Sequence, residues 1–246
     1  MLRPNIKELE AFYNTSLGKV VVRPLRSIIK DFWESSFTRN DSVLGIGFTN
    51  PYLRIFSGET EKVFSFMPKQ QGMASWNNGR KNSSLLGDET RLPFPDSSID
   101  KIILAHSIEF SENLSLFLRE VWRVLTPGGR VILILPNRKG VWSIAGNTPF
   151  GHGRPYTSWQ LENILIDSMF CPLQKKTAVL FPPIKSRVIL RIMMILDKPL
   201  GFTLREFGGI LMLEAEKRIY AMNKGTKIKR LKTRTAEVEN LSLPKE

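Results

Sequence analysis

Residues 88–137 read DETRLPFPDSSIDKIILAHSIEFSENLSLFLREVWRVLTPGGRVILILPN, and this stretch decides the predicted fold. Two short apolar runs within it, residues 102–105 and 131–135, predict β-strands, and an amphipathic helix lies between them. A strand, a helix and a second strand in this order are typical of a βαβ unit, whose two strands run parallel. The stretch therefore predicts an α/β protein.

The helix between these strands has one apolar face. We expect it to stop at residues 126–129, because Pro127 cannot continue a helix and the glycines after it accept a left-handed turn. The flanking strands are almost continuously apolar, which is typical of parallel strands covered on both faces. The apolar stripe of the helix has the spacing i, i+3, i+4, i+7 and i+11 and consists of Leu114, Phe117, Leu118, Val121 and Leu125.

The same stretch resembles a known family. The turn with Asp88, Leu92-Pro93-Phe94 and Asp96, followed by the run LREVWRVLTPGGRVILILPN, is similar to the class I S-adenosylmethionine-dependent methyltransferases, in the branch that acts mostly on small molecules and lipids. The resemblance implies a three-layer α-β-α sandwich with a mostly parallel, seven-stranded sheet. It implies the strand order 3-2-1-4-5-7-6, with the last strand antiparallel. It also implies S-adenosyl-L-methionine as the cofactor and a small molecule as the substrate.

The remaining chain supplies further predicted elements. Residues 6–33 predict one or two helices, which either close the cofactor cleft, as in the resembled family, or fill the core. After the βαβ unit we expect a helix over residues 159–169, a strand over 177–181 and a last strand over 208–215. The amphipathic run 186–196 fits core packing, a substrate cleft or a membrane surface. We divide the chain into an N-terminal helical segment (1–40), a methyltransferase-like Rossmann domain (41–222) and a basic tail (223–246).

Composition limits the class of protein. The chain has 246 residues, of which 42% are apolar, and this is enough for a full core. Its one cysteine, Cys171, excludes an internal disulfide and a cysteine-based zinc site. No apolar run is long enough to span a bilayer and no signal-peptide core begins the sequence, so we expect a cytoplasmic protein. The net charge is +13, and residues 224–234 are rich in Lys and Arg, which predicts either a solvated tail or contact with an anionic partner.

The first glycine motif, within residues 42–52, departs from the family pattern. An acidic residue followed by glycines at alternate positions is expected there, so that the bare backbone can approach the cofactor. Gly45 stands in the place of the acid, Gly47 matches the first glycine, and Thr49 and Pro51 replace the second and third. We assign Gly45, Gly47 and Thr49 as candidate cofactor-binding residues of a divergent site.

The end of the second strand also departs from the pattern. We expect this strand over residues 62–66, and the family places at its end an acid that accepts both ribose hydroxyls. The sequence here is Phe66-Met67-Pro68, without a carboxylate. Residues 69–82, rich in glycine and polar side chains, predict a loop or lid where the family has a regular helix.

Two acidic residues follow the third strand, which we expect over residues 83–86. By resemblance, Asp88 accepts a hydrogen bond from the adenine amino group, with Glu89 beside it in the same turn. An Asp in a turn also caps the turn through its own backbone, which is the structural alternative. Asp100 is expected to cap the entry to its strand.

The candidate catalytic residues are His106, His152 and Arg154. His106 ends the central strand at the edge where open α/β sheets hold ligands, so it is a candidate base or cofactor neighbour. His152 and Arg154 lie in a glycine-rich turn that fits an anionic or carbonyl-bearing substrate, or a loop held by its own hydrogen bonds. Thr157 and Gln160 predict the capping box of the helix that follows.

Two functions fit these patterns. The first is a methyltransferase that acts on a small molecule, since methyl transfer requires little beyond alignment of a nucleophile with the methyl group. The second is a binding module with a degenerate cofactor site, which contacts protein or RNA through its basic surface. The sequence leaves open the acceptor atom, the substrate and the oligomeric state.

Overall fold

A computed structural model describes residues 3–76, 83–184 and 206–219 of the chain. Its centre is a seven-stranded sheet in the order β3-β2-β1-β4-β5-β7-β6. β7 pairs antiparallel with both β5 and β6, and the pairs among β1 to β5 are parallel. The predicted strand order and the antiparallel last strand are therefore confirmed. The strands are β1 (Val43–Gly47), β2 (Val63–Pro68), β3 (Ser84–Gly87), β4 (Ile99–Ala105), β5 (Leu125–Pro136), β6 (Phe170–Ala178) and β7 (Ile210–Lys217).

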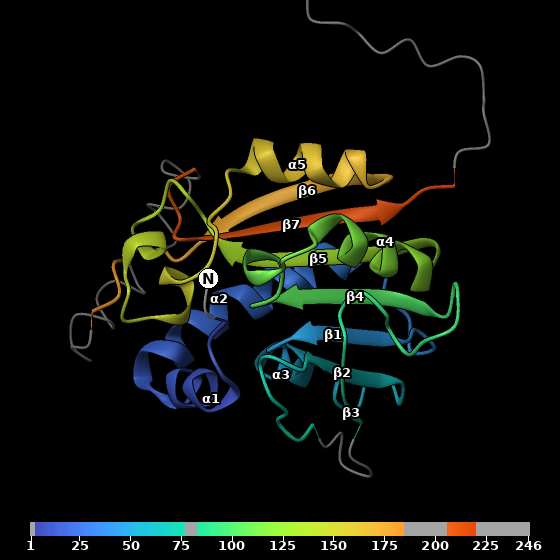
Figure 1. Cartoon of the computed structure of the whole chain (residues 1–246), viewed down its shortest axis with the longest axis horizontal. Coiled ribbons are helices and arrows are strands. Elements are labelled where there is room, and N and C mark those ends of the chain that lie inside the picture. The colour runs from blue at the N-terminus through green and yellow to red at the C-terminus, as the bar shows by residue number, and fades with distance from the viewer. Residues whose placement is uncertain (1–2, 77–82, 185–205, 220–246) are drawn as a thin grey trace, which may run out of the picture.

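Helices cover both faces of the sheet, as the predicted three-layer sandwich requires (Figure 1). Successive strand residues point to opposite faces, so Ile103 and Ile132 pack in one core layer while Ile102 and Leu133 pack in the other. The first layer is covered by α1 (Ile6–Asn14), α2 (Ser16–Trp33) and α3 (Asn50–Leu53). The second is covered by α4 (Leu114–Val124) and α5 (Ser158–Asp167), which lie in front of the sheet in Figure 1.

The N-terminal segment forms two helices, α1 and α2, which are joined by the single residue Thr15. Thr15 ends α1, and its side chain accepts a hydrogen bond from Gly18 N–H and so caps α2. Gly18 allows the helices to approach closely, because a Cβ atom at this position would overlap the carbonyl oxygen of Phe12. This tight corner places α1 at the edge of the sheet toward which the parallel strands point (Figure 1).

The βαβ unit is present with different boundaries. The predicted stripe of α4 is buried at Phe117, Leu118 and Val121, but the helix ends at Val124. Leu125 has extended backbone angles and pairs with Ile99, so it begins β5 instead of ending the helix. The register shifts between this pair and the next, and residues 126–129 therefore form an irregularity within β5. The helix stop was predicted two residues too late.

The C-terminal part of the sheet differs most from the prediction. α5 ends at Asp167, and β6 occupies Phe170–Ala178, whereas a strand was expected over residues 177–181. The sequence of β6 includes Gln174, Lys175 and Lys176 and lacks a strand pattern, but it pairs along its length with the apolar β7. Tertiary pairing therefore overrides local propensity at this sheet edge.

The other differences in boundaries are of a few residues. β2 and β3 extend to Pro68 and Gly87, and β7 begins at Ile210. The amphipathic run 186–196, the basic tail and part of the loop 69–82 lie outside the described residues. Within the described ranges, no helix combines the length and the apolar character that crossing a membrane requires.

Asp100 joins the starts of β1 and β4. Its Oδ2 accepts hydrogen bonds from Ser42 N–H at 2.9 Å and Ser42 Oγ at 2.8 Å, and its Oδ1 accepts one from Thr126 Oγ1 at 3.1 Å. Partial burial alone would raise the pKa of Asp100, but the hydrogen bonds from Ser42 and Thr126 outweigh it and lower the pKa below its usual value. The predicted role of Asp100 at the strand entry is confirmed.

We expect Asp100→Ala to lower the free energy of unfolding by about 1–2 kcal/mol, because Ser42 N–H and Thr126 Oγ1 lose their acceptor while Ser42 Oγ keeps the Ser98 carbonyl. Urea titration at pH 7 measures the difference, with Asp167→Ala, an exposed carboxylate at the end of α5, as the control. The folded-state pKa is lowered, so this contribution is present above the ordinary aspartate pKa of about 4 and is lost as the pH falls through the lowered value. Equal stability of parent and Asp100→Ala at pH 7 would contradict the role.

Candidate functional site

The candidate site lies where the parallel strands end. β1, β2, β3 and β4 terminate at one edge of the sheet, and in open α/β sheets this carboxyl edge is where ligands bind. α1 and the N-terminal end of the described chain lie beside this edge (Figure 1). The edge has an open part beside β3 and a closed part around the ends of β1 and β4.

The open part is a cleft of about 490 Å³, which is within the size range of small-molecule sites. Two of the predicted cofactor-binding residues, Asp88 and Glu89, line it, so the structure brings these two together at one cleft. The other lining residues come from the segment before α1, the segment after β2, the turn after β3, and the residues from the end of β4 into α4. They are Arg3, Gln70, Thr90, Phe110, Glu112, Asn113 and Leu116.

Asp88 presents a charged acceptor to this cleft. Its Oδ1 accepts hydrogen bonds from Thr90 N–H at 2.8 Å and Thr90 Oγ1 at 2.7 Å, which is the predicted turn cap. These two bonds lower the pKa of the exposed carboxyl, so it is ionised at neutral pH. Oδ2 forms no hydrogen bond with any described residue, so one Asp88 side chain can cap the turn and still accept from a ligand.

Glu89 is held by the N-terminal segment. Its side chain forms an ion pair with Arg3 at 2.7 Å, and the residue is 9% exposed. Gln71 makes a second connection, because its carbonyl oxygen accepts from Ile6 N–H and its Nε2 donates to the carbonyl of His106 at 3.2 Å. The segment before α1 is thus attached to the ends of β2, β3 and β4.

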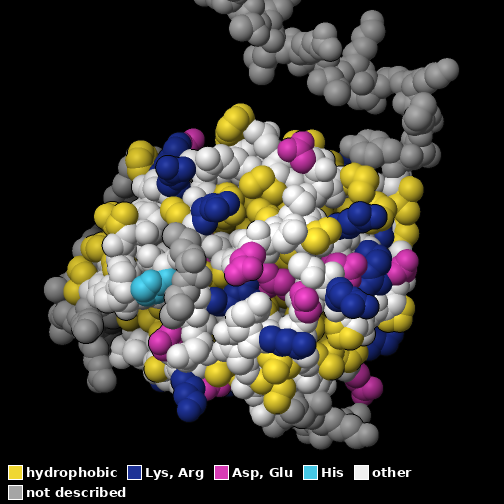
Figure 2. All heavy atoms as spheres, viewed as in Figure 1, with side chains coloured by type: hydrophobic (Ala, Val, Ile, Leu, Met, Phe, Trp, Pro, Cys, Tyr) yellow, Lys and Arg dark blue, Asp and Glu magenta, His cyan; other side chains and the backbone are white. Residues whose placement is uncertain are grey.

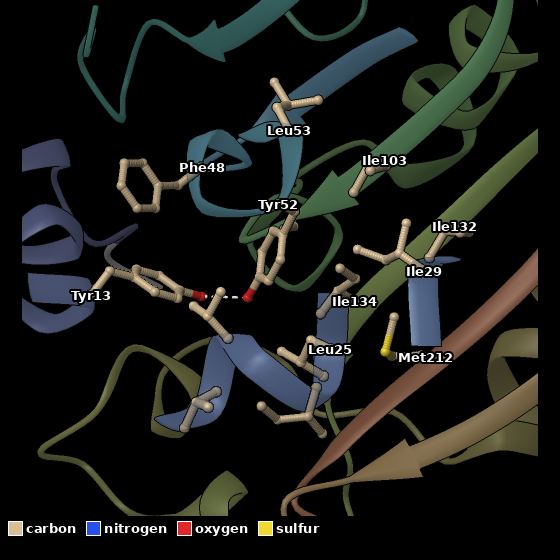
Figure 3. Close-up of a cluster of buried hydrophobic side chains, with 14 of the residues drawn as sticks. Tyr13, Leu25, Ile29, Phe48, Tyr52, Leu53, Ile103, Ile132, Ile134 and Met212 are labelled. Carbon is tan, nitrogen blue, oxygen red and sulfur yellow. Dashed lines mark hydrogen bonds between the residues drawn. The ribbon is translucent and has the colours of Figure 1, made fainter. Parts of the chain in front are cut away.

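The closed part is filled by aromatic side chains. The Tyr13 hydroxyl, from α1, lies 2.8 Å from the Tyr52 hydroxyl and 2.7 Å from His106 Nε2. Figure 3 shows Tyr13 and Tyr52 pointing toward each other, with Phe48 beside the Tyr13 ring. Burial, and next the neighbouring Tyr52, raise the pKa of Tyr13 well above its usual value, so its hydroxyl stays neutral. The ring of His106 is fully buried between Tyr13 and Phe150.

The predicted glycine-motif residues lie under this closed part. A Cβ atom at Gly45 would overlap Thr49 Oγ1, so Gly45 allows Thr49 to fold back onto β1. Gly47 has a φ of +85°, and a Cβ atom there would overlap the carbonyl oxygen of Ala105 in β4. Both glycines therefore have a packing role in the structure, and neither they nor Thr49 line the open cleft. Their contact with a cofactor stays a prediction.

Buried polar atoms without partners concentrate at this edge. His106 Nδ1 lies 3.5 Å from Glu109 Oε1, too far for a strong hydrogen bond. Such atoms are rare in native proteins and cost free energy unless a ligand or water satisfies them. In the described part of the chain they include Arg3 Nη1, Thr49 Oγ1, Gln71 Oε1, His106 Nδ1, Ser107 Oγ, Glu109 Oε1 and Ser111 Oγ.

The three catalytic candidates are not brought together. His106 is buried and bonded to Tyr13, whereas His152 and Arg154 have exposed side chains and do not line the cleft. Their turn is attached to the site through its backbone, because Arg154 N–H donates to the carbonyl of Glu109 at 2.8 Å and Gly153 packs closely on the Glu109 side chain. The capping box of Thr157 and Gln160 is confirmed at the start of α5.

Sequence reasoning missed several residues of this edge. Arg3 contacts Glu89, which lies 86 positions later in the sequence, and Tyr13 contacts His106, which lies 93 positions later. No local sequence pattern reveals contacts of this kind. Tyr13 lies in residues 6–33, for which only helices were predicted. The sequence could have predicted that Gln70 and Glu109 lie at this edge. Each follows a parallel strand within a few residues, and the residues after such strands lie near the carboxyl edge of the sheet.

Comparison with known proteins identifies the domain. Residues 44–133 match the family described as a methyltransferase domain. A demethylmenaquinone methyltransferase of Deinococcus radiodurans is 35% identical over 95 residues, which is 37% of this chain and 39% of the relative. A ubiquinone/menaquinone biosynthesis C-methyltransferase of Geotalea daltonii is 39% identical over 79 residues, 32% of each protein. The chain thus matches well under half the length of these relatives.

Solved structures share the fold over most of the chain. An S-adenosylmethionine-dependent methyltransferase of Thermotoga maritima has a TM-score of 0.60 at 15% identity, covering 87% of this chain and 96% of that one. One of Aquifex aeolicus has a TM-score of 0.53 at 18% identity, covering 86% and 97%. A [4+2]-cyclase has the same fold, with a TM-score of 0.53 at 15% identity, covering 80% and 81%.

The fold is therefore compatible with more than one chemistry, and the similarity to methyltransferases rests on the sequence match over residues 44–133. The resemblance found in the sequence is confirmed over residues 44–133, which match a methyltransferase domain, and the chain has the fold of S-adenosylmethionine-dependent methyltransferases of known structure.

Proposed function

We propose that this protein transfers a methyl group from S-adenosylmethionine to a small molecule. The observation that carries the proposal is the cleft at the carboxyl edge of a methyltransferase domain, where the ionised Asp88 stands beside buried polar atoms that have no partner among the described residues. Such an edge is suited to a polar ligand of nucleoside size.

The residues of the open cleft fit the nucleoside end of the cofactor. The free oxygen of Asp88 would accept from an amino group, and Phe110 offers an apolar side chain in the same cleft. Gln70 lies two residues beyond the end of β2, where the family has its ribose-binding acid, and its amide would replace that carboxylate by hydrogen bonding to hydroxyl groups. When bound, the cofactor supplies an electrophilic methyl group.

The closed part does not leave room for the rest of the cofactor while Tyr13 contacts His106. We infer that binding displaces α1 and separates the Tyr13 hydroxyl from His106 Nε2. The freed imidazole would then lie beside Glu109 and could accept a proton from the methyl acceptor, with Glu109 holding the ring.

A second function is favoured by the same closed part. Thr49 fills the space at the second glycine position, and Met67, buried at the end of β2, accepts a hydrogen bond from Ala74 N–H through its sulfur atom. A chain whose cofactor site is permanently filled in this way would be a binding module built on a methyltransferase domain. The two functions differ in whether S-adenosylmethionine binds.

Isothermal titration with S-adenosylmethionine and S-adenosylhomocysteine separates the two functions. For the parent protein we expect saturable binding at micromolar ligand. We expect Asp88→Ala to weaken it about tenfold or more, because a charged acceptor is lost. Asp88→Asn serves as the matched variant, since its amide oxygen can still cap Thr90 while its charge is gone. A folded parent protein that gives no heat at high micromolar ligand would reject the enzyme and favour the binding module.

The inferred displacement of α1 is tested by Tyr13→Phe. This change removes the hydroxyl that bonds His106 and keeps the ring, so we expect cofactor affinity to rise several-fold, because a contact that competes with binding is lost. Tyr52→Phe is the matched control, since it removes a hydroxyl from the same cluster but leaves the bond between Tyr13 and His106. Equal affinities in both variants and the parent would contradict the displacement.

A further inference from the structure

A row of basic side chains runs along α2. Lys19, Arg23, Arg26 and Lys30 have the spacing i, i+4, i+7 and i+11, so they lie on one face of the helix. At a rise of 1.5 Å per residue, the row is about 16 Å long. Arg54, from the turn of 3-10 helix after α3, lines the same groove from its opposite side.

The groove between α2 and α3 encloses about 850 Å³. Five of its lining residues are cationic, namely the four of α2 and Arg54, and Glu10 is the one acidic lining residue. The groove shares no lining residue with the open cleft that contains Asp88, although Tyr13 and Phe48, which belong to the closed part of the candidate site, form part of its wall.

The positive charges of the groove are not neutralised within the described structure. None of the five cations belongs to an ion pair with a described acidic residue. Arg26 is half-buried, and its Nε donates to the carbonyl of Pro51 at 2.7 Å, which fixes the guanidinium in the groove. Burial, and next the charge of Arg54, lower the pKa of Arg26, so the two guanidinium groups repel each other across the groove.

The groove contrasts with the face drawn in Figure 2, on which basic side chains are scattered among acidic and hydrophobic ones. A concave site with five cations and one acid holds a field of one sign, and a groove focuses that field on an anion. Guanidinium forks match the geometry of phosphate oxygens and bind them in pairs.

We propose that this groove binds a small molecule that carries two or more phosphate groups. The row of cations is several times longer than one phosphate, so a single phosphate would leave most of it unpaired. The volume of the groove lies within the range of small-molecule sites. The groove adjoins the closed part of the candidate site through Tyr13 and Phe48, and the inference does not require the chain to be a methyltransferase.

Two larger anionic partners fit the groove less well. Single-stranded nucleic acid stacks its bases on exposed aromatic rings, but the aromatic residues of the groove, Tyr13 and Phe48, are only 7% and 3% exposed. A membrane surface is contacted by protruding basic and apolar side chains. The groove is concave, and none of the large exposed hydrophobic side chains in the described chain lines it.

Isothermal titration of the full chain with inorganic pyrophosphate and tripolyphosphate tests the proposal. We expect both to bind more tightly than orthophosphate, with an affinity that falls as salt is raised. Arg26→Gln/Arg54→Gln should weaken binding at least about tenfold, because two charge-assisted contacts are lost. Arg39→Gln/Arg119→Gln removes the same charge from exposed positions outside the groove and should bind like the parent.

The single variant Arg54→Gln is added because the double variant could misfold. Arg54 is exposed and its side chain forms no hydrogen bond with the described residues, so its replacement should leave the fold intact. It should weaken pyrophosphate binding several-fold at an unchanged melting temperature. If Arg26→Gln/Arg54→Gln binds pyrophosphate as tightly as the parent, the phosphates bind elsewhere, for example at residues 224–234. This result would overturn the proposal. Tighter binding of a single-stranded oligonucleotide or of phosphatidic acid vesicles, lost in Arg26→Gln/Arg54→Gln, would overturn it in favour of a macromolecular surface.

Discussion

The parallel pairing of β1 with β4 is the constraint on which the site depends. The register runs from Val43 beside Lys101 to Gly47 beside Ala105, so the two strands end together. Phe48 N–H still donates to the carbonyl of Ala105 at 3.0 Å, and the chain can make this approach because Gly47 has no side chain. The residues that follow the two strands are thereby forced to one edge of the sheet. A shift of one residue would turn every apolar side chain of β1 to the opposite core layer.

The elements around this edge were predictable where the pattern is local. The apolar stripe of α4 and the apolar strands beside it identified the central βαβ unit, and the family resemblance extended it to the order of the whole sheet. β6 was misplaced because its stability comes from pairing with β7, whose residues lie about forty positions later. Local propensity contains no information about such a partner.

The site was predictable only in part. Asp88 and Glu89 were found because their turn sits in the recognised stretch, and the capping box at Thr157 followed from residue spacing. The contact of Tyr13 with His106 was not found, because it depends on how the corner between α1 and α2 is folded against a strand end 93 residues away. The basic row of α2 was not predicted, and its meaning depends on the groove that α3 completes.

The central claim is that the cleft beside Asp88 binds the nucleoside of S-adenosylmethionine, and that α1 moves away from His106 so that the rest of the cofactor can bind. A crystal structure of the full chain with S-adenosylhomocysteine tests this most directly. We predict the adenine in the cleft with its amino group on Asp88, and the Tyr13 hydroxyl separated from His106 Nε2. A complex with the ligand outside this cleft, or a structure from saturated solution with the cleft empty and Tyr13 still bonded to His106, would contradict the claim.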